Sequence, residues 1–266
     1  MTGNFRGPLA LHAAVLAIVI TSEAIGVRRL SLGIGVIILL PILYSFAIAI
    51  AVNPNVLAPA GRILSAKEGK LAGLMISVGI MPFIAKFGTT IGPQIGSIIE
   101  AGPALIMQEI GNLGTIAFAF PIAVFALKLG REAIGATYSI DREPNLAIIA
   151  EKYGLDSPEG AGAMGVYATG TLIGTFVFAI VPPLVYSLGV FDIRALAMSC
   201  GVGSGSMLAA CTGSLTALLP DEKDLILGLA AASNVLTYAT GLYLSLFVAL
   251  PLTEWLFAKA RPELQH

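Results

Sequence analysis

Residues 195–215 read A-L-A-M-S-C-G-V-G-S-G-S-M-L-A-A-C-T-G-S-L, an apolar run that three glycines interrupt within five positions. Each glycine weakens a helix by roughly 1 kcal/mol relative to alanine. Small residues four apart, such as Gly201 and Gly205, also allow close helix packing, which is one interpretation of the pattern. The other interpretation, which explains the cost of three glycines better, is a helix that is unwound at a crossing point inside the membrane, where its backbone and hydroxyl groups contact a ligand. In that case the contacts are Gly203, Ser204 and Ser206.

The chain on both sides of this run has the composition of a membrane protein. Of its 266 residues, 56% are hydrophobic and 12% are charged, whereas a soluble domain carries about 25% charged residues. We therefore expect one all-α, polytopic transmembrane domain over residues 1–266, because the apolar blocks lack the alternation of a membrane barrel. Hydropathy places spans near 9–27, 30–52, 70–87, 113–129, 160–189 and 223–258. The last is either one long helix or two helices that meet near Ser233-Asn234.

The two cysteines, Cys200 and Cys211, lie eleven residues apart within the same apolar run. On a continuous helix this separation is about 16 Å, which is too far for a disulfide. We therefore expect free thiols packed as small apolar groups, with a redox or metal pair as the alternative.

A second interrupted segment is G-T-T-I-G-P-Q-I-G-S-I-I-E-A-G-P-A-L-I-M-Q-E-I-G-N at 88–112. One interpretation is an extramembrane hairpin with solvated carboxylates. The other is a pair of half-helices that line a cavity, with Thr89, Thr90 and Gln94 at the break as substrate contacts. Glu109 and Asn112, three residues apart, are expected to share a helix face. The candidates for ion coupling here are Glu100, Glu109 and Asn112.

A third segment, S-I-D-R-E-P-N at 139–145, places three consecutive charges between apolar stretches. It is either a surface loop before a helix that begins at Pro144 and is capped by Asp141 or Ser139, or part of a transport pathway. In the pathway interpretation Arg142 neutralises an organic carboxylate, with Ser139, Asn145 and, from the last span, Asn234 as further substrate contacts. Asp141 or Glu143 then holds Arg142 or carries a coupling proton.

The chain also contains a hint of internal repetition. A shift of 51 residues lays P-Q-I-G-S-I-I-E at 93–100 over P-N-L-A-I-I-A-E at 144–151, and an apolar span follows both. We interpret this as two related units, about 30–130 and 131–258, as in transporters built from repeats.

The run R-E-A-I-G-A-T-Y-S-I-D-R-E-P-N-L-A-I-I-A-E-K-Y-G-L-D-S-P-E-G at 131–160, with A-L-A-M-S-C-G-V-G-S-G-S-M at 195–207, resembles a bacterial integral membrane family known as domain of unknown function 3100. More distantly, the order of elements in the C-terminal half is similar to that of the LrgB/CidB membrane proteins and the 2-keto-3-deoxygluconate permeases. That distant resemblance implies a bile-acid-symporter-like, inverted-repeat fold with two broken helices, and elevator-type alternating access.

These features together favour a secondary active transporter of a small organic anion, coupled to H⁺ or Na⁺. The alternative is a holin-like or passive pore of the LrgB type, which would neither saturate nor show counterflow. An enzyme is disfavoured, since the only histidines are His12 and His266 and no general base accompanies V-G-S-G-S. We expect no catalytic residue, metal site or cofactor except Na⁺ as a coupling ion, and no nucleic-acid partner. The expected protein is a homodimer that crosses the bacterial inner membrane several times.

Overall fold

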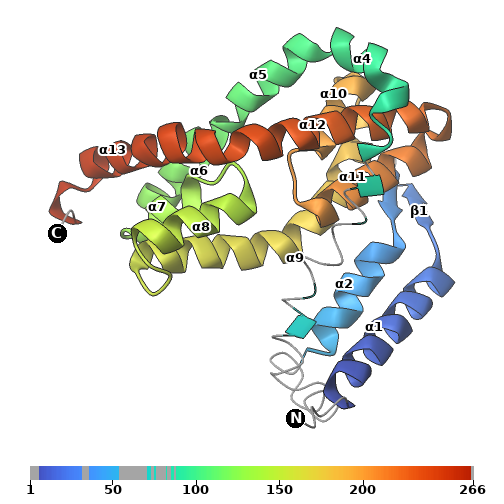
Figure 1. Ribbon diagram of the computed structural model, residues 1–266, viewed down its shortest axis with the longest axis horizontal. Coiled ribbons are helices and arrows are strands. Elements are labelled where there is room, and N and C mark those ends of the chain that lie inside the picture. Colours follow the sequence, from blue (N-terminus) through green and yellow to red (C-terminus); the bar gives the residue numbers. More distant parts are fainter. Residues whose placement is uncertain are drawn as a thin grey trace.

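The computed structural model describes residues 6–31, 36–53, 71–72, 75, 82, 85–86 and 88–264, and this part of the chain is mostly helical (Figure 1). The N-terminal elements are α1 (Arg6–Ile25), β1 (Arg28–Ser31), β2 (Val36–Leu39), α2 (Pro41–Ala51), the 3₁₀ turn η2 (Gly92–Gln94), α4 (Ile95–Glu100), α5 (Gly102–Asn112), α6 (Gly114–Pro121) and the π-helical turn η3 (Ile122–Ala126). The C-terminal elements are α7 (Glu132–Thr137), α8 (Arg142–Lys152), α9 (Pro158–Ser187), α10 (Ile193–Cys200), α11 (Gly205–Leu218), η4 (Pro220–Glu222), α12 (Lys223–Leu244), the π-helical turn η5 (Ser245–Ala249), α13 (Leu250–Ala260) and η6 (Pro262–Leu264). The expected all-α class is confirmed.

The expected span at 30–52 is wrong, because this stretch is not one helix. Arg28–Ser31 and Val36–Leu39 form a two-stranded antiparallel hairpin, in which Arg28 pairs with Leu39 and Ser31 with Val36. The run V-I-I-L is rich in β-branched residues, which favour strands over helices. The helix begins only at Pro41, where the fixed φ of proline suits a first helical turn. The expected span at 70–87 falls mostly outside the described residues.

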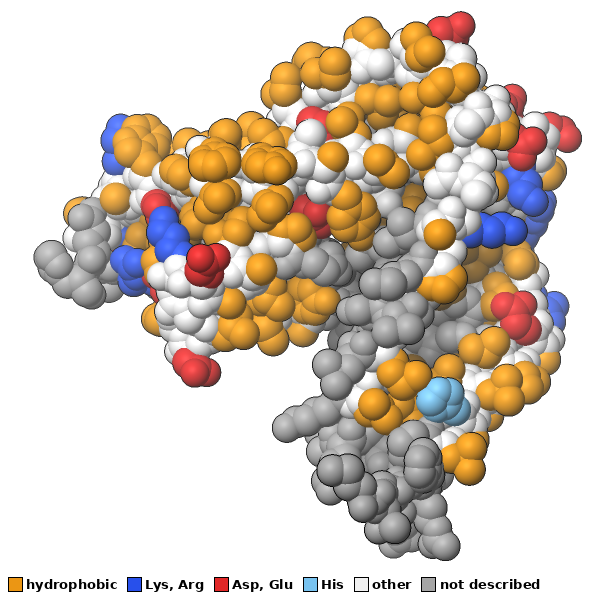
Figure 2. Space-filling model, viewed as in Figure 1, with side chains coloured by type: hydrophobic (Ala, Val, Ile, Leu, Met, Phe, Trp, Pro, Cys, Tyr) orange, Lys and Arg blue, Asp and Glu red, His pale blue; other side chains and the backbone are white. Residues whose placement is uncertain are grey.

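Among the described residues, two helical stretches are long and apolar enough to cross a membrane, Gly102–Ala126 with 25 residues and Pro220–Ala260 with 41 residues. The count rises to three if α9, which bends by 50° between Thr171 and Ile173, is taken as a single span. Hydrophobic side chains cover much of the face seen in Figure 2, and charged side chains gather toward its ends. Large apolar residues such as Phe118 and Phe247 are well exposed on these helices. These features suggest that the protein associates with a membrane.

The last helical stretch is continuous through Ser233-Asn234, so of the two expected arrangements the single long helix is correct. Its 41 residues would extend about 60 Å, which is twice the thickness of a hydrocarbon core. The π-helical turn η5 divides it just before α13, whose second residue, Pro251, has no backbone donor. The portion before this turn, α12, has 22 residues and an extent of about 33 Å, which matches one crossing.

Apolar side chains form two larger clusters at opposite ends of this long helix. One unites α6, η3, α7, α8 and α13 around Tyr138, Ile149 and Phe257. The other unites α5, α10, α11 and α12 around Leu208 and Leu229. In Figure 1 α12 runs between α4 and α5 on one side and α8 and α9 on the other. The polar residues of the candidate site lie on α12 and on the elements that contact it.

Candidate functional site

Polar and small side chains line one face of α12. We call this face the polar stripe and define it as Ser233, Asn234, Thr237, Thr240 and Gly241. These positions follow the helical spacing of three and four residues, so they project from one sector of the helix. Ser233, Asn234 and Thr237 are each less than 5% exposed. Burial of so many polar groups on a membrane-length helix is costly unless each finds a partner.

The most costly group beside the polar stripe is the carboxyl group of Glu109 on α5, which is only 6% exposed. Its Oε1 accepts hydrogen bonds from the Thr237 hydroxyl at 2.6 Å and from Asn112 Nδ2 at 3.4 Å. Its Oε2 is bonded to the Thr240 hydroxyl. Among the described residues, no lysine, arginine or histidine lies within ion-pairing distance of this carboxyl group. The prediction that Glu109 and Asn112 share a face is confirmed.

Two further contacts join the polar stripe to its neighbours. Gln108 Nε2 donates to Ser233 Oγ at 2.6 Å, and Asn234 Nδ2 donates to the carbonyl oxygen of Gly201 at 2.9 Å. Gly201 follows the last residue of α10, where helix carbonyls lack a helical partner. A Cβ at Gly201 would lie 2.4 Å from Ser233 Oγ, so only glycine allows this approach. Asn234 therefore binds the backbone at the place where the helix is interrupted.

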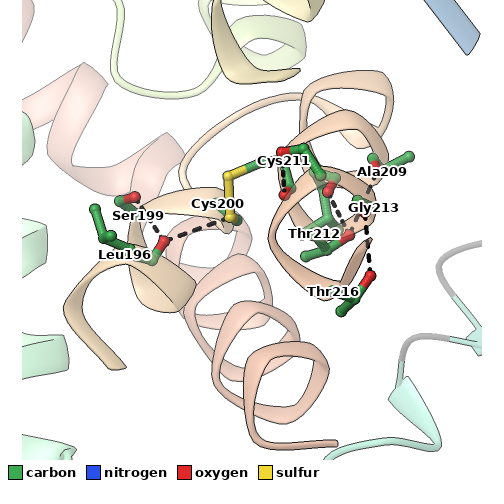
Figure 3. Close-up of a disulfide and its surroundings, with 10 residues drawn as sticks. Leu196, Ser199, Cys200, Ala209, Cys211, Thr212, Gly213 and Thr216 are labelled. Atoms are coloured by element: carbon green, nitrogen blue, oxygen red, sulfur yellow. Dashed lines mark hydrogen bonds between the residues drawn. A yellow bond between two sulfur atoms is a disulfide. The ribbon is translucent and has the colours of Figure 1, made fainter. Parts of the chain in front are cut away.

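The interruption lies between α10 and α11, as the glycines of 195–215 predict. The chain leaves the helix at Gly201 and re-enters it at Gly205, with Ser204 in the N-cap position. Cys200 and Cys211 are joined by a disulfide with a Cα–Cα distance of 5.4 Å (Figure 3). The expectation of free thiols is therefore wrong. It assumed a continuous helix, whereas the turn at Gly201–Ser204 brings α11 back beside the end of α10.

A cluster of hydroxyl groups lies at the start of α11. The Thr175 hydroxyl of α9 donates to Ser206 Oγ at 3.1 Å, and Ser204 Oγ lies 3.2 Å from Ser206 Oγ. Gly203 is needed nearby, because a Cβ there would lie 2.6 Å from Met207 Cβ. The structure thus groups Ser204 and Ser206, as expected, and adds Thr175. The sequence signal for Thr175 was its spacing of four residues from Thr171, which places two hydroxyl groups on one face of an apolar helix.

Asp141 reaches the polar stripe from the turn between α7 and α8. It is 8% exposed, and its Cβ would lie 2.7 Å from a Cβ built at Gly241. Helix α8 begins at Arg142, two residues before the expected start at Pro144, with Asp141 in the N-cap position and no capping bond from its side chain. The side chains of Arg142 and Glu143 lie outside the described part of the structure.

The other expected contacts are distributed away from the polar stripe. Asn145 Nδ2 donates to Ser139 Oγ, and both residues line a cavity of about 30 Å³ between α7, α8 and α9. The Thr90 hydroxyl donates to the carbonyl oxygen of Leu227 at 3.3 Å, and Gln94 packs against Gly228, both near the start of α12. Thr89 bonds the Lys86 carbonyl oxygen, and Glu100 is exposed on α4.

Sequence reasoning did not select Thr237, Thr240 or Gly241. Their signal was their spacing after Ser233-Asn234, which places all five residues on one helix face. No cluster of three or more histidine, cysteine, aspartate or glutamate side chains suited to a metal ion occurs in the described ranges.

Comparison with known proteins gives one match. The family model described as "Protein of unknown function (DUF3100)" matches residues 20–259. No curated protein and no solved structure matches the chain. The distant similarity to LrgB/CidB proteins and sugar-acid permeases therefore stays a prediction.

Proposed function

The chain belongs to the DUF3100 family, whose description assigns no activity, and we propose that it is a secondary active transporter of a small organic anion, coupled to H⁺ or Na⁺. The observation that carries this proposal is the burial of Glu109 where two membrane-length helical stretches meet. The same polar stripe contacts the interruption between α10 and α11 through Asn234 and Ser233. An ionisable group inside a membrane is expensive and marks an ion pathway or a proton relay by default.

The proposed ion-coupling group is the set of polar atoms around Glu109. The carboxyl group bonds Asn112 on its own helix and Thr237 and Thr240 across the helix interface. These bonds join α5 to α12, so a change in the state of the carboxyl group alters the contact between the two helices. Such a link between an ion and a helix interface is what coupled transport requires, because an ion drives a transition only through a difference in its interactions with two states.

The proposed anion-binding group is the start of α11 together with the start of α8. The free N–H groups at the first turn of a helix attract anions, as in the broken helices of transporters. At α11 this first turn adjoins the hydroxyl groups of Ser204, Ser206 and Thr175. At α8 the helix begins at Arg142, whose guanidinium group suits a carboxylate.

The wider architecture is part of the same proposal. We propose a multi-pass protein of the bacterial inner membrane that acts as a homodimer with elevator-type alternating access. The repeat of 93–100 at 144–151 supports two related units within this architecture: the first stretch runs from η2 through α4, the second lies in α8, and each precedes a longer helical stretch. A passive pore remains the competing function, and transport kinetics separate the two.

The test uses the full chain, purified and reconstituted in lipid vesicles. Uptake of radiolabelled mono-, di- and hydroxycarboxylates is measured under an imposed pH or Na⁺ gradient, followed by counterflow with unlabelled substrate. We expect saturable uptake and counterflow for one class of carboxylate, loss of uptake in Arg142→Gln, and normal uptake in the matched variant Arg28→Gln, whose residue is exposed on β1. Unsaturable flux without counterflow would establish a pore, and no uptake of any carboxylate would refute the proposal.

A further inference from the structure

The number of hydrogen atoms around Glu109 decides which ion it holds. A threonine hydroxyl has one hydrogen to donate. The Thr240 hydroxyl contacts two oxygen atoms that accept hydrogen bonds, the carbonyl oxygen of Leu236 at 2.9 Å and Oε2 of Glu109. If Glu109 is ionised, one of these two contacts has no hydrogen. If Glu109 is protonated, its Oε2–H donates to Thr240, Thr240 donates to Leu236, and every contact is satisfied.

The electrostatic surroundings favour the same state. Glu109 has no cationic side chain within ion-pairing distance in the described part of the chain. A buried charge without an opposite charge beside it keeps the full cost of its desolvation. Within the described part of the structure, the groups that bond the carboxyl group are two hydroxyls and the amide of Asn112, all uncharged. A neutral carboxylic acid fits these neighbours, whereas an ionised one would have hydrogen-bond donors but no described cation beside its charge.

We infer that Glu109 carries a proton in this state and that the coupling ion is H⁺; the coupling role rests on the proposed transport function. When the site opens to water, the Oε2–H bond breaks and the proton passes to a water molecule. The Thr240 hydroxyl then rotates, so that its hydrogen leaves the Leu236 carbonyl and binds the new carboxylate. Thr240 is thus a positioning residue that stabilises both protonation states.

Other titratable groups lie near the polar stripe in the described part of the structure. On the α7–α8 side, Asp141 packs against Gly241 and is followed in sequence by Arg142 and Glu143. The cysteines of α10 and α11 are joined in the disulfide and do not titrate. Tyr238 and Tyr243 belong to α12 itself, and Glu100 lies on the exposed side of α4. Asp141 is therefore the acid whose signal has to be separated from that of Glu109.

Infrared spectroscopy of the full chain in lipid vesicles makes this separation. A protonated carboxyl group gives a C=O stretching band that an ionised one lacks. We expect a wild-type band that shifts when glutamate, but not aspartate, carries heavy carbon in its carboxyl group, and that is absent in Glu109→Gln. Thr240→Val should move the band, because its hydrogen-bond partner is lost, and Thr240→Ser should restore the original position. The isotope labelling needs no mutation, so it gives an answer even if a variant misfolds.

The outcomes distinguish this inference from the transport proposal. A wild-type band that does not respond to labelled glutamate would overturn the inference, as would loss of the band on addition of Na⁺ at constant pH. Saturable carboxylate uptake that moves Na⁺ and no protons would overturn the coupling role and leave the transport proposal standing. Proton uptake that accompanies carboxylate uptake, and that is lost in Glu109→Gln, would support both.

Discussion

Glu109 and Glu159 are both buried, but the groups that surround their carboxyl groups differ in charge. Glu159, in the first turn of α9, is 2% exposed and accepts from Arg131 at 2.6 Å. It has a cation and a helix N-terminus to stabilise its charge. Glu109 has two hydroxyls and an amide instead. The first arrangement places a cation beside the carboxyl group, whereas the second surrounds it with uncharged hydrogen-bonding groups.

The largest effect on stability is expected at the ion-paired site. Arg131→Ala leaves Glu159 buried without its cation, and removal of one partner of a buried pair costs about 3 to 5 kcal/mol. Because the Arg131 side chain is 33% exposed, we expect the low end, about 3 kcal/mol, in thermal unfolding of the purified protein. Glu109→Gln keeps the shape and the bonding groups of a protonated acid, so we expect a loss of about 1 kcal/mol or less. Equal losses of unfolding free energy in the two variants would contradict the claim that the Glu159 site depends on a charge pair and the Glu109 site does not.

The disulfide is the next largest contribution, and it belongs to the region of Glu109. The bond closes a loop with a sequence separation of 11, for which loop-closure entropy gives about 3 kcal/mol. We expect the double variant Cys200→Ala, Cys211→Ala to lose about 2 to 3 kcal/mol. The same shift should appear when wild-type protein is unfolded with a reductant present. An unchanged midpoint in both experiments would mean that the contacts of α10 and α11 hold the turn without the bond.

How much the sequence predicts differs between these regions. The glycines of 195–215 predicted the interruption at Gly201–Ser204, because the free-energy cost of a glycine in a helix depends on that residue itself and can be estimated from sequence. The disulfide was missed because the distance between the cysteines was calculated for a continuous helix, and that distance does not apply once the helix is interrupted. The face shared by Glu109 and Asn112 follows from helical spacing, whereas the bonds of Glu109 to Thr237 and Thr240 depend on which helices pack together. The strands at 28–39 were missed because hydropathy does not separate a β-branched run from a helix.

The close contact between the polar stripe and the interrupted hairpin is tested by a pair of glycine variants. In Gly201→Ala the new Cβ would lie 2.5 Å from the carbonyl oxygen of Ala230 and 2.4 Å from Ser233 Oγ. Such overpacking costs about 1 to 3 kcal/mol, and we expect about 2 kcal/mol in thermal unfolding. The matched control is Gly165→Ala on α9, where a Cβ meets nothing within 4 Å. This control should stabilise the protein by about 0.5 kcal/mol. Stabilisation by both variants would contradict the close approach of Gly201 to α12.

The smallest expected effect lies at the entrance to the hairpin, where Asp192 caps α10. Its carboxylate accepts from the backbone N–H of Arg194 at 2.8 Å, and this bond, aided by the Arg194 side chain, lowers the pKa of Asp192. A lowered pKa means that the carboxylate stabilises the fold above its unfolded value of about 3.9 and that this contribution is lost as the pH falls through the folded pKa. Because the Asp192 side chain is 57% exposed, we expect Asp192→Ala to cost only about 0.5 kcal/mol at neutral pH, the low end for an N-cap. The difference between wild type and variant should shrink in unfolding scans at acidic pH. If the difference in unfolding free energy between wild type and variant instead grows on acidification, the protonated acid is the stabilising form, and the negative charge at this helix start contributes no stability.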